Sequence, residues 1–336
     1  MFSPKFTLTP KLLTNLTEIE RYYGQLEGIR IPQQLQLNLE RTNLIQSSYA
    51  SNSIEGNPLS VGEVTNLILN DRVPTNRSEK EIFNYFSILK QLDKKKNDPF
   101  SLSLILDIHS ELLNGINDKI KGQIRNVPIV VGRRQIDQPI IIKHNPPFHD
   151  QSGIKNALKD LAEWASSTKD SPVLSAGIFN NEFVYLHPFE DGNGRTCRLL
   201  TALILLSHNY QINKYFVLDD YYDIDRLLYS DSLHSADSGD KTIWLEYFTD
   251  GVKYSLQSAL SKVKEGIAKL SFDVRPSPRE QEALEIAKQY KEIISADLVR
   301  ELKITRQQAF NLLKSLSEKG FLDKKGTTKN SYYVLK

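Results

Sequence analysis

Residues 187–198 read HPFEDGNGRTCR, a run of twelve positions that holds a titratable base, a carboxylate, a glycine-rich turn and two arginines. The apolar residues before it, from Val173 to Leu186, have helical spacing. We expect that helix to end near His187, because a residue that precedes proline is disfavoured in the α region. His187 would then stand at a helix exit, largely neutral at cellular pH and able to accept a proton from a hydroxyl.

The turn at residues 192–194 predicts an anion site. Gly and Asn tolerate positive φ, which can aim successive backbone N–H groups at one point. An apolar helix expected over about residues 195–207 begins there, so its dipole adds to these amides. Asp191 offers hard oxygens suited to Mg²⁺ beside a phosphate. Arg195 and Arg198 are three positions apart, so they share one helical face, and their guanidinium groups match phosphate oxygens. The residues alone therefore predict a nucleotide site.

The same run resembles the motif of the Fic family, His-x-Phe-x-(Asp or Glu)-Gly-Asn-(Gly or Lys)-Arg-x-x-Arg, and fills it without a departure. Most Fic proteins transfer AMP from Mg-ATP to a protein hydroxyl. The resemblance implies that His187 is the general base and that Asp191 holds Mg²⁺. It implies contacts with ATP, mainly through the phosphates, for the rest of the run: Gly192, Asn193, Gly194, Arg195, Thr196 and Arg198. The alternative is a helical connector with solvated arginines.

A second segment of interest is residues 51–56, SNSIEG, which Asn-Pro follows. Gly, Asn and Pro directly after Glu55 predict a helix end, and from composition alone Glu55 would be an ordinary polar residue there. The segment resembles the inhibitory helix of many Fic proteins, (Ser or Thr)-x-x-x-Glu-(Gly or Asn). That resemblance implies that Glu55, with Ser51, pairs with Arg198 and takes the cation that should orient the γ-phosphate of ATP. The resting enzyme would then be autoinhibited.

Two β-branched triplets, residues 129–131 and 140–142, predict a hairpin in an otherwise helical domain. A small edge ribbon is the alternative. In Fic proteins a β-hairpin flap stands here and holds the backbone of the target protein by strand addition, so residues 129–142 are predicted to be the flap, with a protein substrate as its partner. The first strand would also line the nucleotide: Ile129, Val130, Val131 and Gly132. His144 and His149 are predicted to belong to a turn rather than to form a metal pair.

Tyrosines gather after the motif helix, and such aromatic clusters are usually part of a core. Fic proteins carry a Tyr-rich helix near the adenine. Alignment with its Tyr-Tyr-x-x-Leu pattern makes Tyr229 the candidate here, with Ser230 in place of the second tyrosine. Asp237 stands where the family often has Asn. The resemblance alone therefore predicts these three residues as nucleotide contacts.

The chain changes character from about residue 273, where Pro-Ser-Pro at 276–278 predicts a linker into a capped helix. Two more helices and a hairpin around residues 324–326 follow, the pattern of a winged helix-turn-helix. Residues 299–330 hold eight basic residues against three acidic ones, a net charge of +5. Such a charge suits a phosphate-contacting face. DNA and a protein partner are equal alternatives for this module.

The composition is that of an ordinary globular protein, with 40% hydrophobic and 25% charged residues among 336, enough for two or three domains. A net charge of +2 argues against capture of the whole protein by nucleic acid or a membrane. Cys197 is the single cysteine, which excludes an intramolecular disulfide and a cysteine zinc cage. We recognise no signal peptide, and the apolar run around residues 199–206 falls short of the ~20 residues that span a bilayer. We therefore expect a cytoplasmic protein with no membrane partner.

Together these features predict a mainly α protein in three parts. Residues 1–98 form a helical region with the inhibitory segment, residues 99–258 a Fic core with the flap and the motif, and residues 273–336 a winged helix-turn-helix. The predicted activity is transfer of AMP from Mg-ATP to Ser, Thr or Tyr hydroxyls. The alternatives are a Fic enzyme that removes AMP or transfers another phosphate-linked group, and a DNA-binding regulator with a Fic sensor domain. The sequence leaves the oligomeric state open, with a homodimer as one candidate.

Overall fold

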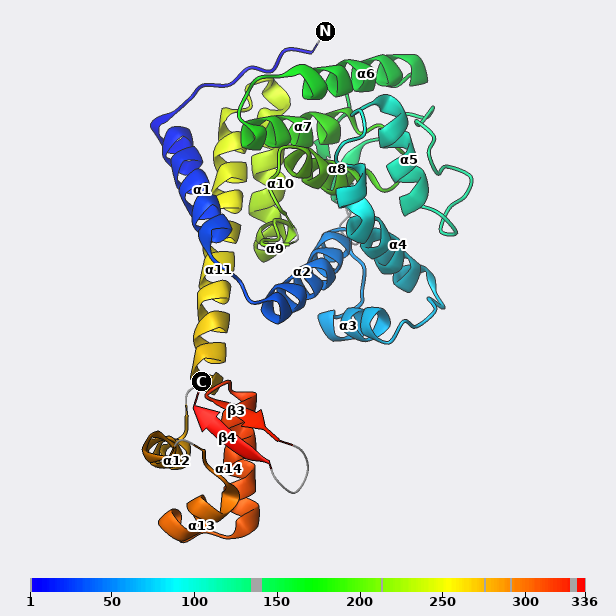
Figure 1. Cartoon of the computed structure of the whole chain (residues 1–336). Coiled ribbons are helices and arrows are strands. Elements are labelled where there is room, and N and C mark those ends of the chain that lie inside the picture. The colour runs from blue at the N-terminus through cyan, green and yellow to red at the C-terminus, as the bar shows by residue number, and fades with distance from the viewer. Residues whose placement is uncertain are drawn as a thin grey trace. The chain divides into compact units, whose positions relative to one another are not determined.

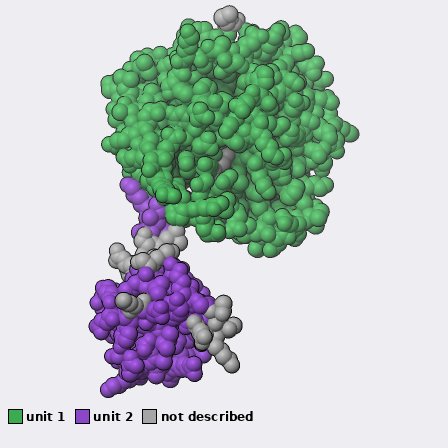
Figure 2. Space-filling model, in the orientation of Figure 1, with its two compact units in different colours: residues 1–262 green, residues 263–336 purple. Residues whose placement is uncertain are grey.

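The computed structural model describes residues 2–133, 141–212, 214–274, 276–290, 292–326 and 331–335. The chain divides into two compact units, residues 1–262 and 263–336 (Figure 2). The prediction of a mainly α fold is confirmed. Helices dominate both units, and the described strands form two separate antiparallel hairpins (Figure 1).

The first unit is built from helices in chain order. They are α1 (Pro10–Gly28), α2 (Gln33–Ile54), α3 (Val61–Leu69), α4 (Arg77–Gln91), α5 (Leu102–Leu112), α6 (Gln151–Ser167), α7 (Pro172–Leu186), α8 (Asn193–Ser207), α9 (Asp219–Ile224) and α10 (Arg226–His234), with two short 3-10 helices, η1 (Leu92–Lys95) and η2 (Ser235–Ser238). A long helix, α11 (Thr242–Val274), begins in this unit and continues past its boundary.

Helices α7 and α8 pack against each other and form the core around the motif (Figure 1). Nearly every residue of both helices is buried, as expected for helices that are apolar on most of their circumference. Helix α6 covers α7, while α2, α4 and α5 contact α8. The connection between α7 and α8 is residues 187–192. The motif turn is therefore supported on both sides by buried helices.

Helix α2 ends at the segment that the sequence predicts to be inhibitory. Its C-cap is Glu55, and Gly56 follows with a φ of 86° in the left-handed region that glycine adopts readily. The predicted helix end is confirmed. Helix α3 then begins with Ser60 and Glu63 in a capping box. The segment that carries Glu55 thus lies between two defined helix termini.

The predicted hairpin forms, with its strands displaced toward the C-terminus. Strand β1 covers Val131–Arg133 and β2 covers Ile141–His144, rather than residues 129–131 and 140–142. The strands are antiparallel. Residues 134–140, the remainder of the predicted flap, lie outside the described residues.

The displacement of the hairpin has a local cause. Val131 pairs with His144, so any earlier residue of the first strand would have to pair with residues 145–147. Two of these are prolines, which have no backbone N–H and cannot extend the ladder. The pairing therefore stops at Val131, and Ile129 and Val130 precede the strand.

Helix α11 extends past residue 258, where the sequence predicts the Fic core to end, and buried apolar positions continue along it at helical spacing. They are Val252, Leu256, Ala259, Leu260 and Val263. No helix among the described residues is both long enough and apolar enough to cross a membrane.

The second unit contains three further helices and a hairpin. They are α12 (Pro278–Gln289), α13 (Ser295–Leu302), α14 (Arg306–Glu318), β3 (Leu322–Lys325) and β4 (Tyr332–Leu335). Its core is a cluster that includes Ala283, Leu298 and Leu313, one from each helix. Ile293 forms an isolated bridge with Tyr333 of β4, which ties the segment before α13 to the hairpin.

Candidate nucleotide site

His187 is the C-cap of α7 and has a left-handed backbone, with φ 44° and ψ 63°. Its Nδ1 lies 3.3 Å from the carbonyl of Val184. A carbonyl can only accept, so Nδ1 carries the proton and Nε2 has the free lone pair. Burial lowers the pKa of His187 to about 4. The side chain is therefore a neutral base at neutral pH.

The carbonyl of His187 is held by Arg125, a residue that the sequence analysis missed. Arg125 is 1% exposed. Its guanidinium donates to the carbonyls of His187, Val127 and Phe148 at 2.7, 3.0 and 2.7 Å. Val127 and Phe148 precede and follow the hairpin, so one buried cation joins both ends of the hairpin segment to the backbone of the motif. A lone arginine in a loop has no local pattern that would have identified it.

The turn before α8 differs in detail from the predicted one. Gly192 has a φ of 78°, whereas residues 193 and 194 are already helical, so the helix begins two residues earlier than predicted. The Asn193 side chain accepts from the N–H of Phe189 and donates to its carbonyl, at 2.9 and 2.7 Å. These bonds close the loop. The first N–H groups of α8 have no acceptor within the helix, as at any helix N-terminus, and the anion site there stays a prediction.

Arg198 meets the end of α2. Its Nη2 lies 2.7 Å from a carboxylate oxygen of Glu55 and 2.8 Å from the carbonyl of Ser51, and its Nε donates to the Ser51 hydroxyl at 2.7 Å. Arg198 is 3% exposed. Burial alone would lower the pKa of its guanidinium, but the Glu55 carboxylate and other nearby groups raise it, so Arg198 stays charged. The structure thus brings together the two residues and the serine that the sequence linked.

Gly194 lies directly beneath this ion pair. A Cβ at this position would overlap the carboxylate of Glu55 and lie 3.0 Å from an Nη atom of Arg198. A side chain at residue 194 would therefore displace the Glu55 carboxylate from its present position beside Arg198.

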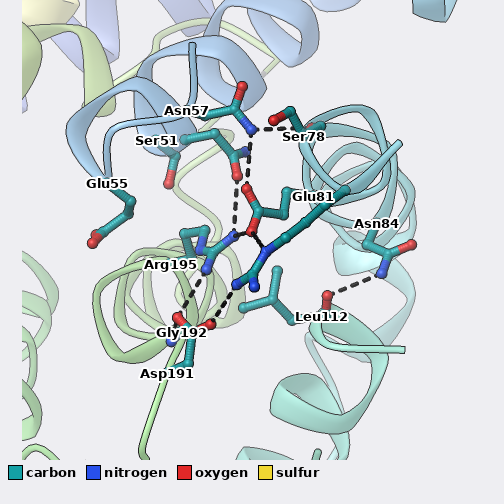
Figure 3. Close-up of polar contacts among 12 residues, drawn as sticks. Ser51, Glu55, Asn57, Ser78, Glu81, Asn84, Leu112, Asp191, Gly192 and Arg195 are labelled. Carbon is teal, nitrogen blue, oxygen red and sulfur yellow. Dashed lines mark hydrogen bonds and ion pairs between the residues drawn. The ribbon is translucent and has the colours of Figure 1, made fainter. Parts of the chain in front are cut away.

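Asp191 and Arg195 belong to a chain of ion pairs that reaches α4 (Figure 3). Arg195 donates to Asp191 at 3.2 Å and lies 3.5 Å from Glu81. Arg77 donates to Asp191 and Glu81 at 3.1 and 3.0 Å. Arg195 also contacts Asn52 of α2, at 3.4 Å. The sequence analysis singled out only Asp191 and Arg195 of this chain of contacts.

Thr196 and Tyr229 are buried. The N–H of Thr196 bonds the carbonyl of Gly192 at 2.9 Å within the helix, and its side chain is 0% exposed. The Tyr229 ring stacks on Tyr222 with centroids 4.5 Å apart and is 7% exposed. Neither side chain is appreciably accessible to solvent, so both belong to the packed interior next to the predicted nucleotide site.

The described residues of the first predicted flap strand, 129–132, are at least partly exposed to solvent. Val130 and Gly132 are exposed, and Ile129 and Val131 are half-buried. Ser230 accepts a hydrogen bond from Lys143 of β2 at 3.2 Å. This contact joins the hairpin to α10.

Asp237 binds histidines. His144 donates from Nδ1 to Asp237 at 2.7 Å and from Nε2 to the carbonyl of Tyr185 at 2.8 Å. Both partners only accept, so His144 is an imidazolium. Burial works to lower the pKa of His144, but these two bonds outweigh it and raise the pKa. One ring nitrogen each of His144 and His234 and one carboxylate oxygen of Asp237 lie within 4.8 Å of one another. The negative charge of Asp237 balances the positive charge of the His144 imidazolium. His149 is not part of this cluster.

Asp219 is a further residue that the sequence analysis missed. It lies 4.0 Å from Nε of Arg198 and accepts a hydrogen bond from Ser47. Burial raises the pKa of Asp219 to about 6, against the opposing effect of Arg198. Arg198 therefore lies between an exposed carboxylate, Glu55, and a buried one.

Comparisons with known proteins place this geometry in context. Residues 99–205 match the profile of the Fic/DOC family. The protein adenylyltransferase fic-1 of Caenorhabditis elegans is 28% identical over 251 residues, which cover 70% of this chain and 46% of the relative. The chain therefore spans less than half the length of that relative.

Solved structures are similar over more of the chain. A Fic family protein from Desulfovibrio desulfuricans G20 aligns over 100% of this chain and 98% of its own, with a TM-score of 0.69 and 26% identity. Fic-1 from C. elegans aligns over 76% of this chain and 73% of its own, with a TM-score of 0.62 and 22% identity. The second likeness is one of fold.

Proposed function

Since the chain carries a Fic domain over residues 99–205, as its motif predicts, we propose that it is a protein adenylyltransferase that transfers AMP from ATP to a protein hydroxyl. One observation supports this above the others. His187, a neutral base, and the unpaired N–H groups that begin α8 flank one short loop, and α8 carries two buried arginines. The C. elegans relative is named a protein adenylyltransferase, which supports the same activity.

His187 takes the proton in the proposed reaction. Its Nδ1–H is directed to Val184, so Nε2 is the acceptor. The hydroxyl oxygen of the target forms a bond to the α-phosphorus of ATP, and the bond from this phosphorus to the oxygen shared with the β-phosphate breaks. Pyrophosphate leaves, and the hydroxyl proton passes to Nε2. The N–H groups and dipole at the start of α8 bind the phosphate charge.

Asp191 is the residue that would hold Mg²⁺. Its carboxylate precedes α8, its side chain is 34% exposed, and it offers the hard oxygens that this ion prefers. When bound, Mg²⁺ neutralises phosphate charge beside the helix end. The donor chemistry fits, and the two oxygens of Asp191 at present bind arginines.

Glu55 keeps the proposed enzyme at rest. Arg198 is the cation assigned to the γ-phosphate, and Glu55 and Ser51 accept three hydrogen bonds from it. A carboxylate on a guanidinium competes directly with a phosphate for the same N–H groups. ATP would therefore bind in a poorly reactive pose until Glu55 moves.

The protein substrate docks on the hairpin β1–β2. A two-stranded sheet has free edges, and an edge can pair with an extended segment of another protein. Lys143 bonds Asp231 at 3.0 Å and His144 bonds Asp237, so β2 is anchored at its base. Strand addition reads backbone more than side chains, which suits targets whose Ser, Thr or Tyr lies in varied sequences.

The test uses wild type, Glu55→Gly and Glu55→Gly/His187→Ala, each incubated with Mg-ATP labelled on the α- or the γ-phosphate and then weighed intact. We expect AMP and the α label on Glu55→Gly, no γ label, and no product from the double variant. His208→Ala in the Glu55→Gly background is the matched control, because His208 is an exposed histidine at the end of α8. Transfer of the γ label would contradict the proposal. Release of AMP from a modified protein, without transfer, would favour the hydrolytic alternative.

We propose in addition that residues 276–335 form a winged helix that binds DNA. Four exposed side chains of α14 support this, because they are of the kinds that contact phosphates and base edges. They are Arg306, Gln307, Asn311 and Lys314, and Gln308, Phe310 and Glu318 of the same helix are exposed as well. Four residues of the predicted basic face form ion pairs: Arg300 with Asp297, Lys314 with Glu318, Lys319 with Glu280 and Lys325 with Asp323. Lys329 lies outside the described residues.

A gel shift tests the second proposal. Wild type should retard a DNA duplex in a salt-dependent manner, and Arg306→Ala/Lys314→Ala should weaken this retardation. Arg279→Ala/Lys288→Ala is the matched control of equal charge, because both residues are exposed on α12 and lie outside residues 299–330. Equal retardation by all three proteins, or none by wild type, would contradict DNA binding and favour the protein-partner alternative.

A further inference from the structure

Two residues of α4 contact the motif from outside it: Arg77 bonds Asp191, and Glu81 pairs with Arg195 (Figure 3). The Arg77 guanidinium bridges two carboxylates, with Nε 3.0 Å from Glu81 and Nη2 3.1 Å from Oδ2 of Asp191. The other oxygen of Asp191 accepts from Arg195 at 3.2 Å and from the N–H of Gly192 at 2.6 Å. Both oxygens of Asp191 are thus bound to donors of this chain.

We propose that Arg77 competes with the divalent metal ion for Asp191, and that Glu81 is the positioning residue that takes Arg77 when the ion binds. This inference rests on the proposed function, which makes Asp191 the metal ligand. A guanidinium and a metal ion both require the lone pairs of a carboxylate oxygen, and both are positive, so they exclude each other at that oxygen.

The exposure of the two arginines indicates which carboxylate oxygen of Asp191 would bind the ion. The side chain of Arg77 is 63% exposed, whereas that of Arg195 is 4% exposed. An exposed ion pair is weak and exchanges readily with water. Arg195 is further held by Asn52 and Glu81. The ion therefore displaces Arg77 from Oδ2 and leaves the bond between Arg195 and Oδ1.

Glu81 holds Arg77 nearby when the ion displaces it from Asp191, so that Arg77 can return when the ion leaves. Its side chain is 13% exposed, and one oxygen lies 3.0 Å from Arg77 and 3.5 Å from Arg195. Its other oxygen accepts from Asn57 at 3.0 Å, two residues after Glu55. Arg77 can leave Asp191 and keep its Nε bond to Glu81. Without the charge of Glu81, Asp191 would be the remaining carboxylate within reach of Arg77 and would be held more tightly.

The test measures metal binding directly, by electron paramagnetic resonance of free Mn²⁺ with ADP present. We expect Arg77→Ala to bind Mn²⁺ about 2- to 5-fold more tightly than wild type, the range that an exposed ion pair supports. Glu81→Gln should bind it more weakly by a similar factor. Arg77→Ala/Glu81→Gln should bind it as Arg77→Ala does, because the effect of Glu81 acts through Arg77. A merely structural role for Glu81 would weaken binding in both backgrounds.

Arg72→Ala is the matched control. Arg72 precedes α4 and is an exposed arginine that pairs with Glu79 of α4. Its removal should leave the affinity for Mn²⁺ unchanged. Equal affinity in wild type and Arg77→Ala, or weaker binding in Arg77→Ala, would overturn the inference. Absence of Mn²⁺ binding that depends on Asp191 would overturn it together with the metal role. Intact mass measurement of AMP transfer by Glu55→Gly separates the two cases. If AMP is still transferred while Mn²⁺ affinity is unchanged in Arg77→Ala, this inference fails and the proposed function stands.

Discussion

Arg198 of α8 donates a hydrogen bond to Glu55 at the C-cap of α2, across 2.7 Å and 143 positions of sequence. The same guanidinium donates to the carbonyl and the hydroxyl of Ser51. The negative end of the α2 dipole adds to the attraction. The cation expected to bind phosphate is thus directed at the end of another helix.

Replacement of Glu55 should therefore raise affinity for nucleotide. We expect Glu55→Gln to bind a non-hydrolysable ATP analogue about 10-fold more tightly, because an uncharged amide oxygen holds Arg198 less strongly than a carboxylate, whose hydrogen bond with a cation contributes ~1.5–3 kcal/mol. Isothermal titration calorimetry measures this. Glu63→Gln, at the exposed start of α3, is the control. Equal affinity in wild type and Glu55→Gln would contradict competition for Arg198.

A side chain at residue 194 should weaken the contact between Glu55 and Arg198. Gly194→Ala places a Cβ on the Glu55 carboxylate, so this partly exposed side chain must turn away from Arg198, and the loss of their hydrogen bond costs about 1 kcal/mol. Urea unfolding should show this loss in the wild-type background and little loss in the Glu55→Gly background. If Gly194→Ala cost the same free energy of unfolding in both backgrounds, the carboxylate would not be the cause.

Arg125 should matter for both stability and transfer. Arg125→Met leaves the carbonyls of Val127, Phe148 and His187 without this donor, and we expect a loss of about 3 kcal/mol in the free energy of unfolding, because each hydrogen bond from a charged group contributes ~1.5–3 kcal/mol. Arg21→Met, which removes an exposed arginine paired with Glu18, should change it by less than ~0.5 kcal/mol. In the Glu55→Gly background, Arg125→Lys should lower AMP transfer more than affinity for the ATP analogue. Wild-type stability of Arg125→Met would contradict this role.

Acid should destabilise the fold through His109. This side chain is 0% exposed, and burial lowers its pKa to about 4. The folded state therefore resists protonation, while the unfolded chain binds a proton below its usual pKa of about 6.5. The contribution of His109 to the free energy of unfolding is therefore fully present above pH 6.5 and is lost as the pH falls toward 4. We expect the loss from this residue to be about 2 kcal/mol between pH 7.5 and 5. Urea unfolding of His109→Gln should show a smaller loss over this range, and an equal loss would contradict the assignment.

Local rules accounted for much of the fold and part of the site. Proline after His187 predicted the end of α7, and Gly56 predicted the end of α2, because backbone sterics act within a few residues. The same rules misplaced the hairpin strands, because the two prolines at residues 146 and 147 were not weighed against pairing. The start of α8 was misplaced because Asn193 and Gly194 were assigned to the turn, although only Gly192 has a positive φ.

The sequence by itself determined which residues are proposed to carry the chemistry: His187, Asp191 and Arg198 form a motif within one short loop and the helix that follows it. Only the tertiary structure decided what those residues contact. Arg77 lies 114 positions from Asp191 and Arg125 lies 62 from His187. Such pairs have no local signature, because a hydrogen bond extends about 3 Å and the packing of helices alone decides which distant side chains come within that distance.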